Sequence, residues 1–370
     1  MVFLPDNARP FVRKSMFACT KFFPINQSDV SYIVEPKNWA IKSEGINIVR
    51  HARLIKPGIK LGITSRPYLT NSKILHFGSQ FMFQNWLKYV PINSKIVTTY
   101  FHGKMGFSKG IDDNLNFLVE NQNRISRVIV SCTEMYYRLQ EYGIKPNLLI
   151  KIPIGISTNT FKPISDLYEK SRIKAKYGIP KDILLVGSFQ KDGIGWRRGN
   201  IPKLIKGPDI LVESLKEISN KRRICVLLTG PSRGYVINSL RNLGIEFWHL
   251  EPKTEFEMAE IYRTLDLYLI TSRDEGGPKG LIESLSSGCP VVTTPVGLAK
   301  DIDLKSKHFV VTKTFKPSEI ARESIAILDG IVSSDDKKLL QKSVKFCEWE
   351  KVADLHVNHV YNPILNGYCP

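Results

Sequence analysis

The sequence predicts an α/β protein of two Rossmann-like domains whose parallel sheets face a central cleft. Short apolar runs rich in β-branched residues alternate with longer amphipathic segments from about residue 30 onward, as strands and helices do in parallel sheets. The same alternation resumes after a break near residue 163. The 370 residues are 42% hydrophobic and 24% charged, so the chain can form two cores and is neither disordered, collagen-like nor a disulfide scaffold.

The elements are expected in two series of six strands with helices between them. In the first series we predict strands at residues 30–35, 59–64, 73–78, 94–101, 127–132 and 148–153, with helices near 43–55, 80–88, 112–124 and 133–142. In the second we predict strands at residues 183–188, 224–230, 245–250, 265–271, 290–295 and 308–312, with helices near 207–219, 233–243, 255–263 and 280–287.

The break between the two series lies in residues 157–182, where strand periodicity is lost and Pro163 and Gly178 occur. We place the boundary at residue 163, which gives domains of residues 1–163 and 164–345. Apolar positions at helical spacing near the end of the chain, with no strand after them, predict a terminal helix. We expect this C-terminal segment, 346–370, to pack back on the first domain.

Charge and cysteine content suggest a location for the protein. The formal net charge is +18, and residues 51–100 hold seven basic residues and no acidic one. No apolar run reaches the about 18 residues of a membrane span, and charged residues interrupt the apolar residues at the N-terminus, which argues against a secretory signal. The six cysteines form no CxxC pair and no Cys/His cluster. We therefore expect a cytoplasmic protein with reduced thiols.

The most informative segment is residues 271–297, TSRDEGGPKGLIESLSSGCPVVTTPVG. Glu275 lies on the turn after an apolar strand, the run Gly276–Pro278 leads into a helix, and Glu283 lies on that helix. Carboxylates accept hydrogen bonds from sugar hydroxyls, while the free N–H groups of a helix start donate to anionic oxygens. This layout suits a ligand that carries both hydroxyl and phosphate groups.

In these residues the sequence resembles the family 4 glycosyltransferases of the GT-B fold, whose hallmark is two glutamates separated by seven residues in a strand, loop and helix. The match is Glu275 to Glu283. The resemblance implies that Glu275 contacts the donor sugar and Glu283 the ribose of the nucleotide. It also implies donor binding by the connecting residues Gly276, Gly277, Lys279, Gly280 and Leu281. Two surface or capping glutamates are the ordinary alternative, which the surrounding segment disfavours.

Three further segments, residues 150–163, 184–215 and 227–240, resemble the same family in the same order. In the second, Lys206 and Gly207 match a Lys–Gly pair just before a helix. The resemblance implies that Lys206 neutralises the donor phosphate.

The end of the first strand of this segment departs from the family pattern. Gly187 and Ser188 are expected at the donor, but the family often has an arginine directly after the glycine. Arg197 or Arg198, in an unusually long loop, is a candidate replacement. In the third segment, Arg233 could reach the phosphate or the nucleobase, or be an ordinary arginine at a helix start.

The first domain is expected to hold the acceptor. His102 ends a predicted strand, and the resemblance implies that it is a cleft histidine near the reacting sugar; an ordinary core or surface histidine is the alternative. Asn38 and Trp39 follow the first strand. The Trp39 ring could stack on a sugar with its flat face, or it could pack within the domain as an anchor.

The resemblance implies a hexosyltransferase that moves a sugar from a nucleotide-diphosphate sugar to a glycan or lipid-linked acceptor with retention of anomeric configuration. The catalytic residues would be His102, Lys206 and Glu275. No cofactor is expected besides the donor substrate, and no metal, because the only DxD-like sequence, residues 301–303, lies away from the inferred donor loop.

Two rival functions and one location stay open. A nucleic-acid binder would explain the basic charge, but no nucleic-acid-binding signature occurs, so no nucleic acid is expected as a partner. An epimerase or phosphorylase on the same fold is the second rival. The basic first domain could also bind an anionic membrane at the inner face, with residues 81–89 as an interfacial helix or as the buried face of a domain helix.

Overall fold

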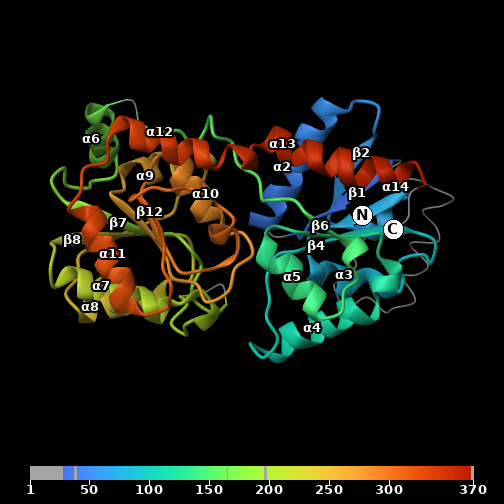
Figure 1. The fold of residues 1–370 in the computed structure, drawn as a ribbon, viewed down its shortest axis with the longest axis horizontal. Coiled ribbons are helices and arrows are strands. Elements are labelled where there is room, and N and C mark those ends of the chain that lie inside the picture. The colour runs from blue at the N-terminus through green and yellow to red at the C-terminus, as the bar shows by residue number, and fades with distance from the viewer. Residues whose placement is uncertain (1–27, 37–39, 165, 196–197, 368–370) are drawn as a thin grey trace. The chain divides into compact units, whose positions relative to one another are not determined.

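The computed structural model describes residues 28–36, 40–164, 166–195 and 198–367. The chain divides into two compact units, Met1–Gly155 with Trp349–Pro370, and Ile156–Glu348 (Figure 1). The division falls eight residues before the predicted boundary at 163, because Phe161 is buried and its carbonyl accepts a 2.5 Å hydrogen bond from Ser286 Oγ of the second unit.

The first unit contains a parallel sheet in the order β2-β1-β3-β4-β5-β6. Its strands are β1 (Val30–Ile33), β2 (Leu61–Thr64), β3 (Ile74–Phe77), β4 (Lys95–Tyr100), β5 (Arg127–Val130) and β6 (Leu149–Lys151). All six predicted strands of this half are present, each within its predicted range. The order reverses between β1 and β3, which is where doubly wound sheets leave a crevice for ligands.

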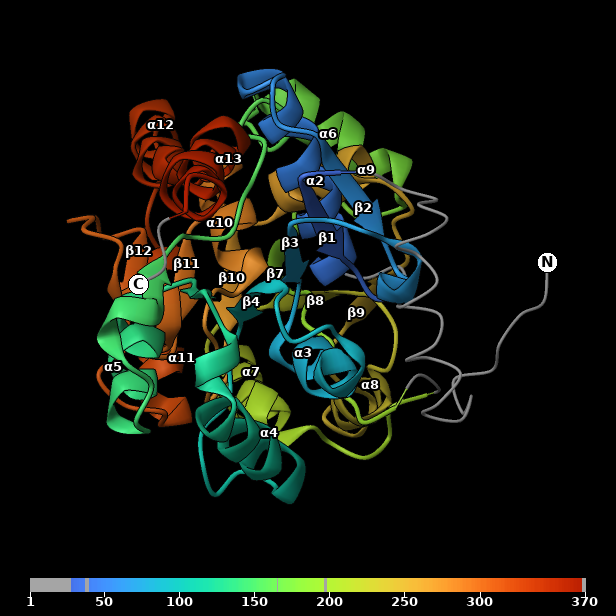
Figure 2. The same cartoon turned by 90° about the vertical axis from the view of Figure 1, so that its right-hand side faces the viewer.

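Four helices follow the strands of the first unit: α2 (Ala40–Ile55), α3 (Gln80–Trp86), α4 (Lys109–Glu120) and α5 (Thr133–Glu141). Figure 2 shows α3 and α4 side by side. The terminal segment, α13 (Trp349–His356) through α14 (Asn362–Leu365), packs against α2 (Figure 1). A buried hydrogen bond of 2.7 Å between His76 Nδ1 and the Tyr361 hydroxyl ties this segment to the sheet.

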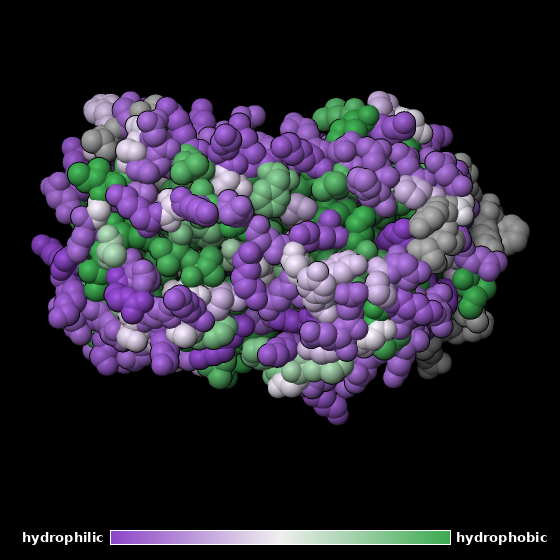
Figure 3. All heavy atoms as spheres, in the orientation of Figure 1, coloured by the Kyte–Doolittle hydropathy of each residue, from purple (hydrophilic) through white to green (hydrophobic). Residues whose placement is uncertain are grey.

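The aromatic segment 81–89 belongs to the core of the first unit. Ser79 caps α3, and the side chains of Met82, Phe83, Leu87 and Tyr89 are buried. The interpretation of this segment as a membrane-interface helix is therefore wrong, because its apolar face packs against its own domain. On the face shown in Figure 3, the hydrophobic patches are separated by hydrophilic residues.

The second unit repeats the design with the sheet order β12-β11-β10-β7-β8-β9. Its strands are β7 (Leu184–Ser188), β8 (Ile224–Thr229), β9 (Phe247–Leu250), β10 (Leu267–Ile270), β11 (Val291–Thr293) and β12 (Phe309–Val311). The helices that connect and cover them are α7 (Pro208–Ser219), α8 (Gly234–Asn242), α9 (Glu255–Thr264), α10 (Lys279–Ser286) and α11 (Pro317–Leu328). The six strands predicted for this half are all present, and the order reverses between β7 and β10.

Two further helices of the second unit were not predicted, α6 (Leu167–Lys176) and α12 (Ser334–Ser343). In α6 many positions are polar or charged, and Asp166 caps it with a hydrogen bond from the Glu169 N–H of 2.7 Å. Because α6 has few apolar residues on its buried side, the hydrophobic periodicity of the sequence did not predict this helix. Within the described ranges, every helix is too short or too polar to cross a membrane.

Candidate functional site

The predicted donor residues gather at the carboxyl edge of the second sheet. Strands β7 and β10 are neighbours at its reversal point, and the loops that leave them are residues 189–207 and 271–278. Because ligands of doubly wound sheets bind at this edge, both predicted segments lie where the fold places a ligand.

Lys206 and Glu275 form an ion pair at this edge. Lys206 Nζ lies 2.5 Å from Glu275 Oε1, with side-chain exposures of 15% and 11%. The single hydroxyl hydrogen of Ser272 is shared between this carboxylate oxygen and Gln190 Oε1, which lie 3.1 and 3.0 Å from Ser272 Oγ. Gln190 Nε2 donates to the Lys206 carbonyl at 2.6 Å. The two predicted residues are thus held together by a closed ring of contacts.

Gly207 fixes the backbone that carries Lys206. It adopts a left-handed conformation with φ of 61° as the N-cap of α7, and a Cβ at this position would come within 1.8 Å of the Thr271 carbonyl oxygen. Only glycine fits such a position without strain. Lys206 is therefore placed directly before the N-terminus of α7, where the helix dipole favours an anion.

The Glu275 loop is supported from the next strand. A Cβ on Gly297, which has φ of 47°, would overlap the carbonyl oxygens of Glu275 and Gly276. The Leu298 N–H donates to the Gly276 carbonyl at 2.7 Å, and Thr294 Oγ1 donates to the Ser272 carbonyl at 2.6 Å. The turn after β11 therefore sets the height of the loop over the sheet.

Glu283 lies on α10, one turn after the start of the helix. Its carboxylate accepts a hydrogen bond of 2.9 Å from the buried hydroxyl of Tyr262. Burial raises the pKa of Glu283, while the charge of Lys279 and the Tyr262 hydrogen bond oppose the rise. A carboxylate in this state gains from any further donor, which is what a ribose hydroxyl would supply.

The start of α10 places the other predicted residues of this segment. Gly280 packs on the Tyr268 ring, where a Cβ would lie 2.3 Å from the hydroxyl oxygen. Lys279 is partly exposed at the first turn. Leu281 is fully buried and its N–H donates to the Pro278 carbonyl at 2.9 Å, so this residue contributes to the core and not to the ligand surface.

Arg233 is placed differently from the sequence prediction. Its side chain is fully buried, with Nε and Nη2 each 3.0 Å from the Asp192 carboxylate. Its Nη1 donates to the carbonyls of Ser188 and Thr229 at 2.6 and 3.1 Å. An arginine enclosed in this way cannot reach a phosphate or a base without leaving these partners, so its position corrects the prediction of a donor contact.

Gly187 and Ser188 end β7 as predicted, but both face inward. A Cβ on Gly187 would overlap the Leu265 side chain, and Ser188 is 1% exposed. Gly187 therefore allows close packing beneath the site, and Ser188 contributes its carbonyl to Arg233.

In the first unit, His102 lies just beyond β4 and is partly buried. Its carbonyl accepts a hydrogen bond of 2.9 Å from Gln80 Nε2, and the Phe101 N–H donates to Gln80 Oε1 at 3.3 Å. The next residue, Gly103, has φ of 143°, and its carbonyl accepts from the Tyr100 hydroxyl and Arg138. The backbone at His102 is thus held firmly. Asn38 and Trp39 lie outside the described residues.

Sequence reasoning missed several residues that position the site, namely Asp192, Gln190, Tyr262, Ser272 and Gly297. Gly297 carried a signal, since a glycine after a strand and a Pro–Val pair suggests a tight turn. The others are common polar residues whose partners lie far away in the chain. Among the residues that the structure describes, no three His, Cys, Asp or Glu side chains are grouped as a metal site would require.

Comparisons with known proteins agree with this geometry. Residues 181–330 match the family model described as Glycosyl transferases group 1. A D-inositol 3-phosphate glycosyltransferase of Corynebacterium aurimucosum is 27% identical over 199 residues, which are 50% of this chain and 42% of that protein. A mannosylfructose-phosphate synthase of Agrobacterium fabrum is 25% identical over 171 residues, 42% of this chain and 34% of that protein. The chain thus spans less than half the length of these relatives.

Solved structures are similar to this chain over both of its units. Anabaena HepE, in complex with UDP and glucose, superposes with a TM-score of 0.70 at 15% identity, covering 90% of this chain and 99% of that one. The sucrose-phosphate synthase of Thermosynechococcus elongatus also gives 0.70 at 15% identity, covering 91% and 99%. Residues 181–330 are therefore similar to the group 1 glycosyltransferases, and the two Rossmann-like units have the GT-B fold.

Proposed function

We propose that the protein transfers a sugar from a nucleotide-diphosphate sugar to a hydroxyl of a glycan or lipid-linked acceptor, with retention of anomeric configuration and without a metal ion. The observation that carries the proposal is the Lys206–Glu275 pair at the reversal point of the second sheet, with Glu283 on the adjoining helix. Relatives named as glycosyltransferases and a fold neighbour solved with UDP and glucose support the same donor class.

On the donor side, each group has a chemical task. Glu283 would accept hydrogen bonds from the ribose, and Glu275 from the sugar hydroxyls. Lys206 and the N-termini of α7 and α10 would face the diphosphate. During transfer the bond from the anomeric carbon to the β-phosphate oxygen breaks, so negative charge grows on the diphosphate. Preorganised cations and N–H groups stabilise that charge most strongly, which makes a metal ion unnecessary.

On the acceptor side, the proposal assigns the first unit. The acceptor hydroxyl oxygen forms the new bond to the anomeric carbon and passes its proton to the leaving oxygen of the diphosphate. His102 is the candidate group near the reacting sugar, because its backbone is fixed at the carboxyl end of β4, at the same edge as the reversal point of that sheet.

A panel of nucleotide sugars tests the proposal. The purified protein should be stabilised against thermal unfolding by one nucleotide-sugar class, and it should consume that donor faster with a mixture of membrane lipid extract and oligosaccharides than alone. The anomeric configuration of the product, read by NMR, tests retention, and excess EDTA tests metal independence. Epimerised donor, or sugar phosphate formed from inorganic phosphate and a glycan, would show that an epimerase or a phosphorylase is the correct assignment. Retention on DNA that falls with salt, without donor binding, would favour the nucleic-acid binder.

A further inference from the structure

The long loop after β7, at the carboxyl edge of the second sheet, has regular hydrogen bonds of its own. Ile194 N–H donates to the Ile201 carbonyl at 2.9 Å, Lys203 N–H donates to the Asp192 carbonyl at 2.7 Å, and Gly193 and Pro202 form an antiparallel bridge. The described parts of the loop are thus folded back on themselves as a short hairpin. The fully buried Asp192–Arg233 pair anchors its base.

This hairpin covers the start of α8. The Gly234 N–H donates to the Arg198 carbonyl at 2.7 Å, and the Tyr235 N–H donates to the Gly199 carbonyl at 3.0 Å. These N–H groups of the helix start are therefore already satisfied by the chain itself. A donor phosphate therefore has to find its positive partners elsewhere on this edge, and the return half of the hairpin offers one of them.

The return half brings a second lysine to the Lys206 turn. Lys203 is the N-cap of the single 3-10 turn Leu204–Lys206, and the Lys206 N–H donates to the Lys203 carbonyl at 2.8 Å. Lys203 is partly buried, and no hydrogen bond or ion pair of its ammonium group exists among the described residues. Partial burial of an ammonium group that has no hydrogen-bond partner costs free energy, and a bound anionic ligand would remove this cost.

The charges around Lys203 do not balance. Burial and the repulsion of Lys206 and Lys191 lower the pKa of Lys203 to about 8, and only Glu275 opposes this. Since the Glu275 carboxylate is already paired with Lys206 at 2.5 Å, it cannot fully balance the charge of Lys203 as well. A diphosphate is an anion of the size and charge that would balance it.

We propose that Lys203 is a second phosphate-binding cation of the donor site. Lys206 shares its charge with Glu275, whereas the Lys203 ammonium has no hydrogen-bond or ion-pair partner in the described part of the chain and can therefore pair with the diphosphate. This inference rests on the proposed function. Arg198 is a weaker candidate, because it is exposed and its backbone serves the start of α8.

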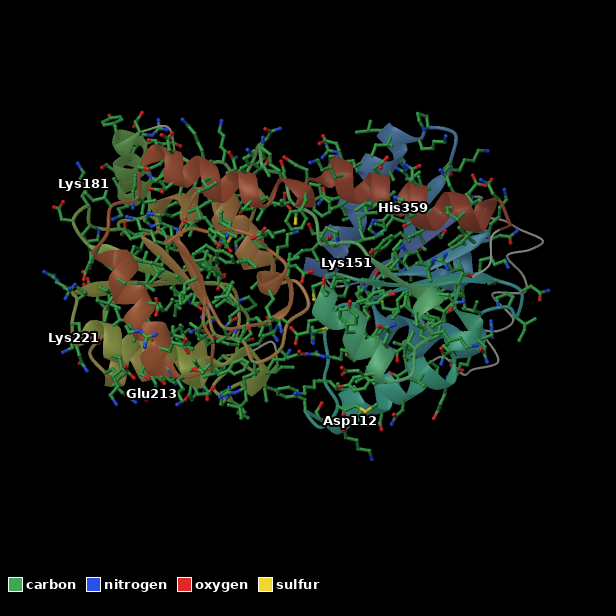
Figure 4. All side chains as sticks on the ribbon, viewed as in Figure 1. Asp112, Lys151, Lys181, Glu213, Lys221 and His359 are labelled. Carbon is green, nitrogen blue, oxygen red and sulfur yellow. The ribbon has the colours of Figure 1, made fainter. Side chains whose placement is uncertain are left out.

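Calorimetry on the full-length protein tests the inference. Uridine, guanosine, adenosine and cytidine diphosphates identify the diphosphate that binds, and the matching nucleoside is measured beside it. Lys203→Met should weaken the diphosphate about tenfold, which corresponds to about 1.4 kcal/mol, while nucleoside affinity stays unchanged. Lys203→Arg should restore most of the loss. Lys221→Met, an exposed lysine at the periphery of the second unit in Figure 4, is the matched control and should bind like the wild type.

The outcomes separate this inference from the proposed function. If the wild type binds a diphosphate and Lys203→Met binds it equally well, Lys203 is no phosphate ligand and the inference is overturned, while the proposed function stands. If Lys203→Met loses nucleoside and diphosphate affinity equally, together with its melting temperature, the residue has a structural role and the inference is overturned as well. If the wild type binds none of the four diphosphates, both proposals fail.

Discussion

At the residue scale, Lys206 forms an ion pair with Glu275, so removing the Lys206 side chain has two separable effects. Lys206→Ala removes a cation from the donor phosphate and leaves the Glu275 carboxylate with Ser272 as its hydrogen-bond partner in the ring. We predict that kcat falls by about 10²- to 10³-fold, as expected for one preorganised charge-stabilising group.

The control for Lys206→Ala is Lys216→Ala, which breaks an exposed Lys–Glu pair on α7. Exposed pairs contribute about 0 to 1 kcal/mol, so this variant should keep both activity and melting temperature. Equal losses of activity and melting temperature in Lys206→Ala would instead indicate a structural lysine.

Glu283 offers a test of ribose recognition. Because burial raises the pKa of Glu283, its ionised form is not what stabilises the fold, and Glu283→Ala should leave the protein folded. Loss of hydrogen bonds from the ribose to a charged acceptor should weaken donor binding by about 1.5 to 3 kcal/mol. Calorimetry measures this. A donor affinity equal to that of the wild type would remove Glu283 from the site.

His102 offers a test of the acceptor side. His102→Ala should lower the transfer rate and keep donor affinity, because the donor groups described above all lie on the second unit. The backbone at residue 102 stays fixed by Gln80, whose contacts are to main-chain atoms. Rates of transfer and of donor hydrolysis, measured side by side, decide the role. A wild-type transfer rate would exclude a catalytic histidine.

At the scale of the elements, the loop after β7 depends on one buried ion pair. Arg233→Met leaves the Asp192 carboxylate buried without its cation, and breaking such a pair costs about 3 to 5 kcal/mol. We predict a large fall in the free energy of unfolding, measured in urea, and a smaller fall in the double variant Asp192→Leu, Arg233→Met. A fully stable Arg233→Met protein with weak donor binding would restore the role that the sequence predicts.

The sequence predicted the strands better than it predicted the residues that hold the site loops in place. Every predicted strand is present because β-branched apolar runs such as Ile224–Thr229 are buried on both faces of a parallel sheet and carry a strong local signal. Lys206, Glu275 and Glu283 were predicted as site residues because the two short segments that carry them resemble segments of a known family. Asp192 and Arg233 lie 41 residues apart in the sequence, and no local sequence pattern shows that they will form a buried ion pair.

At the scale of the whole molecule, the charge is uneven along the chain. Residues 1–150 hold 20 Lys and Arg against 9 Asp and Glu, or +11, and the remaining 220 residues hold 33 against 26, or +7. The described part of the first unit also exposes large apolar side chains, with Leu54 at 72% and Ile92 at 75%. Since the apolar face of α3 is buried, a membrane contact made by the described residues of this unit has to come from such charges and scattered side chains, which argues for weak, reversible binding.

Sedimentation with liposomes tests this contact. Each basic residue near an anionic surface contributes about 1 kcal/mol, and salt screens the attraction over about 10 Å at 0.1 M. We predict that the bound fraction rises with anionic lipid content and falls with salt. Replacing three exposed lysines of the first unit, Lys56, Lys60 and Lys88, by glutamate should abolish binding, whereas the same change at Lys181, Lys216 and Lys221 of the second unit alters the net charge equally and should preserve most of it. Equal losses in the two triple variants would show that net charge, and not this surface, governs binding. Absence of wild-type binding even at low salt would point to a soluble acceptor.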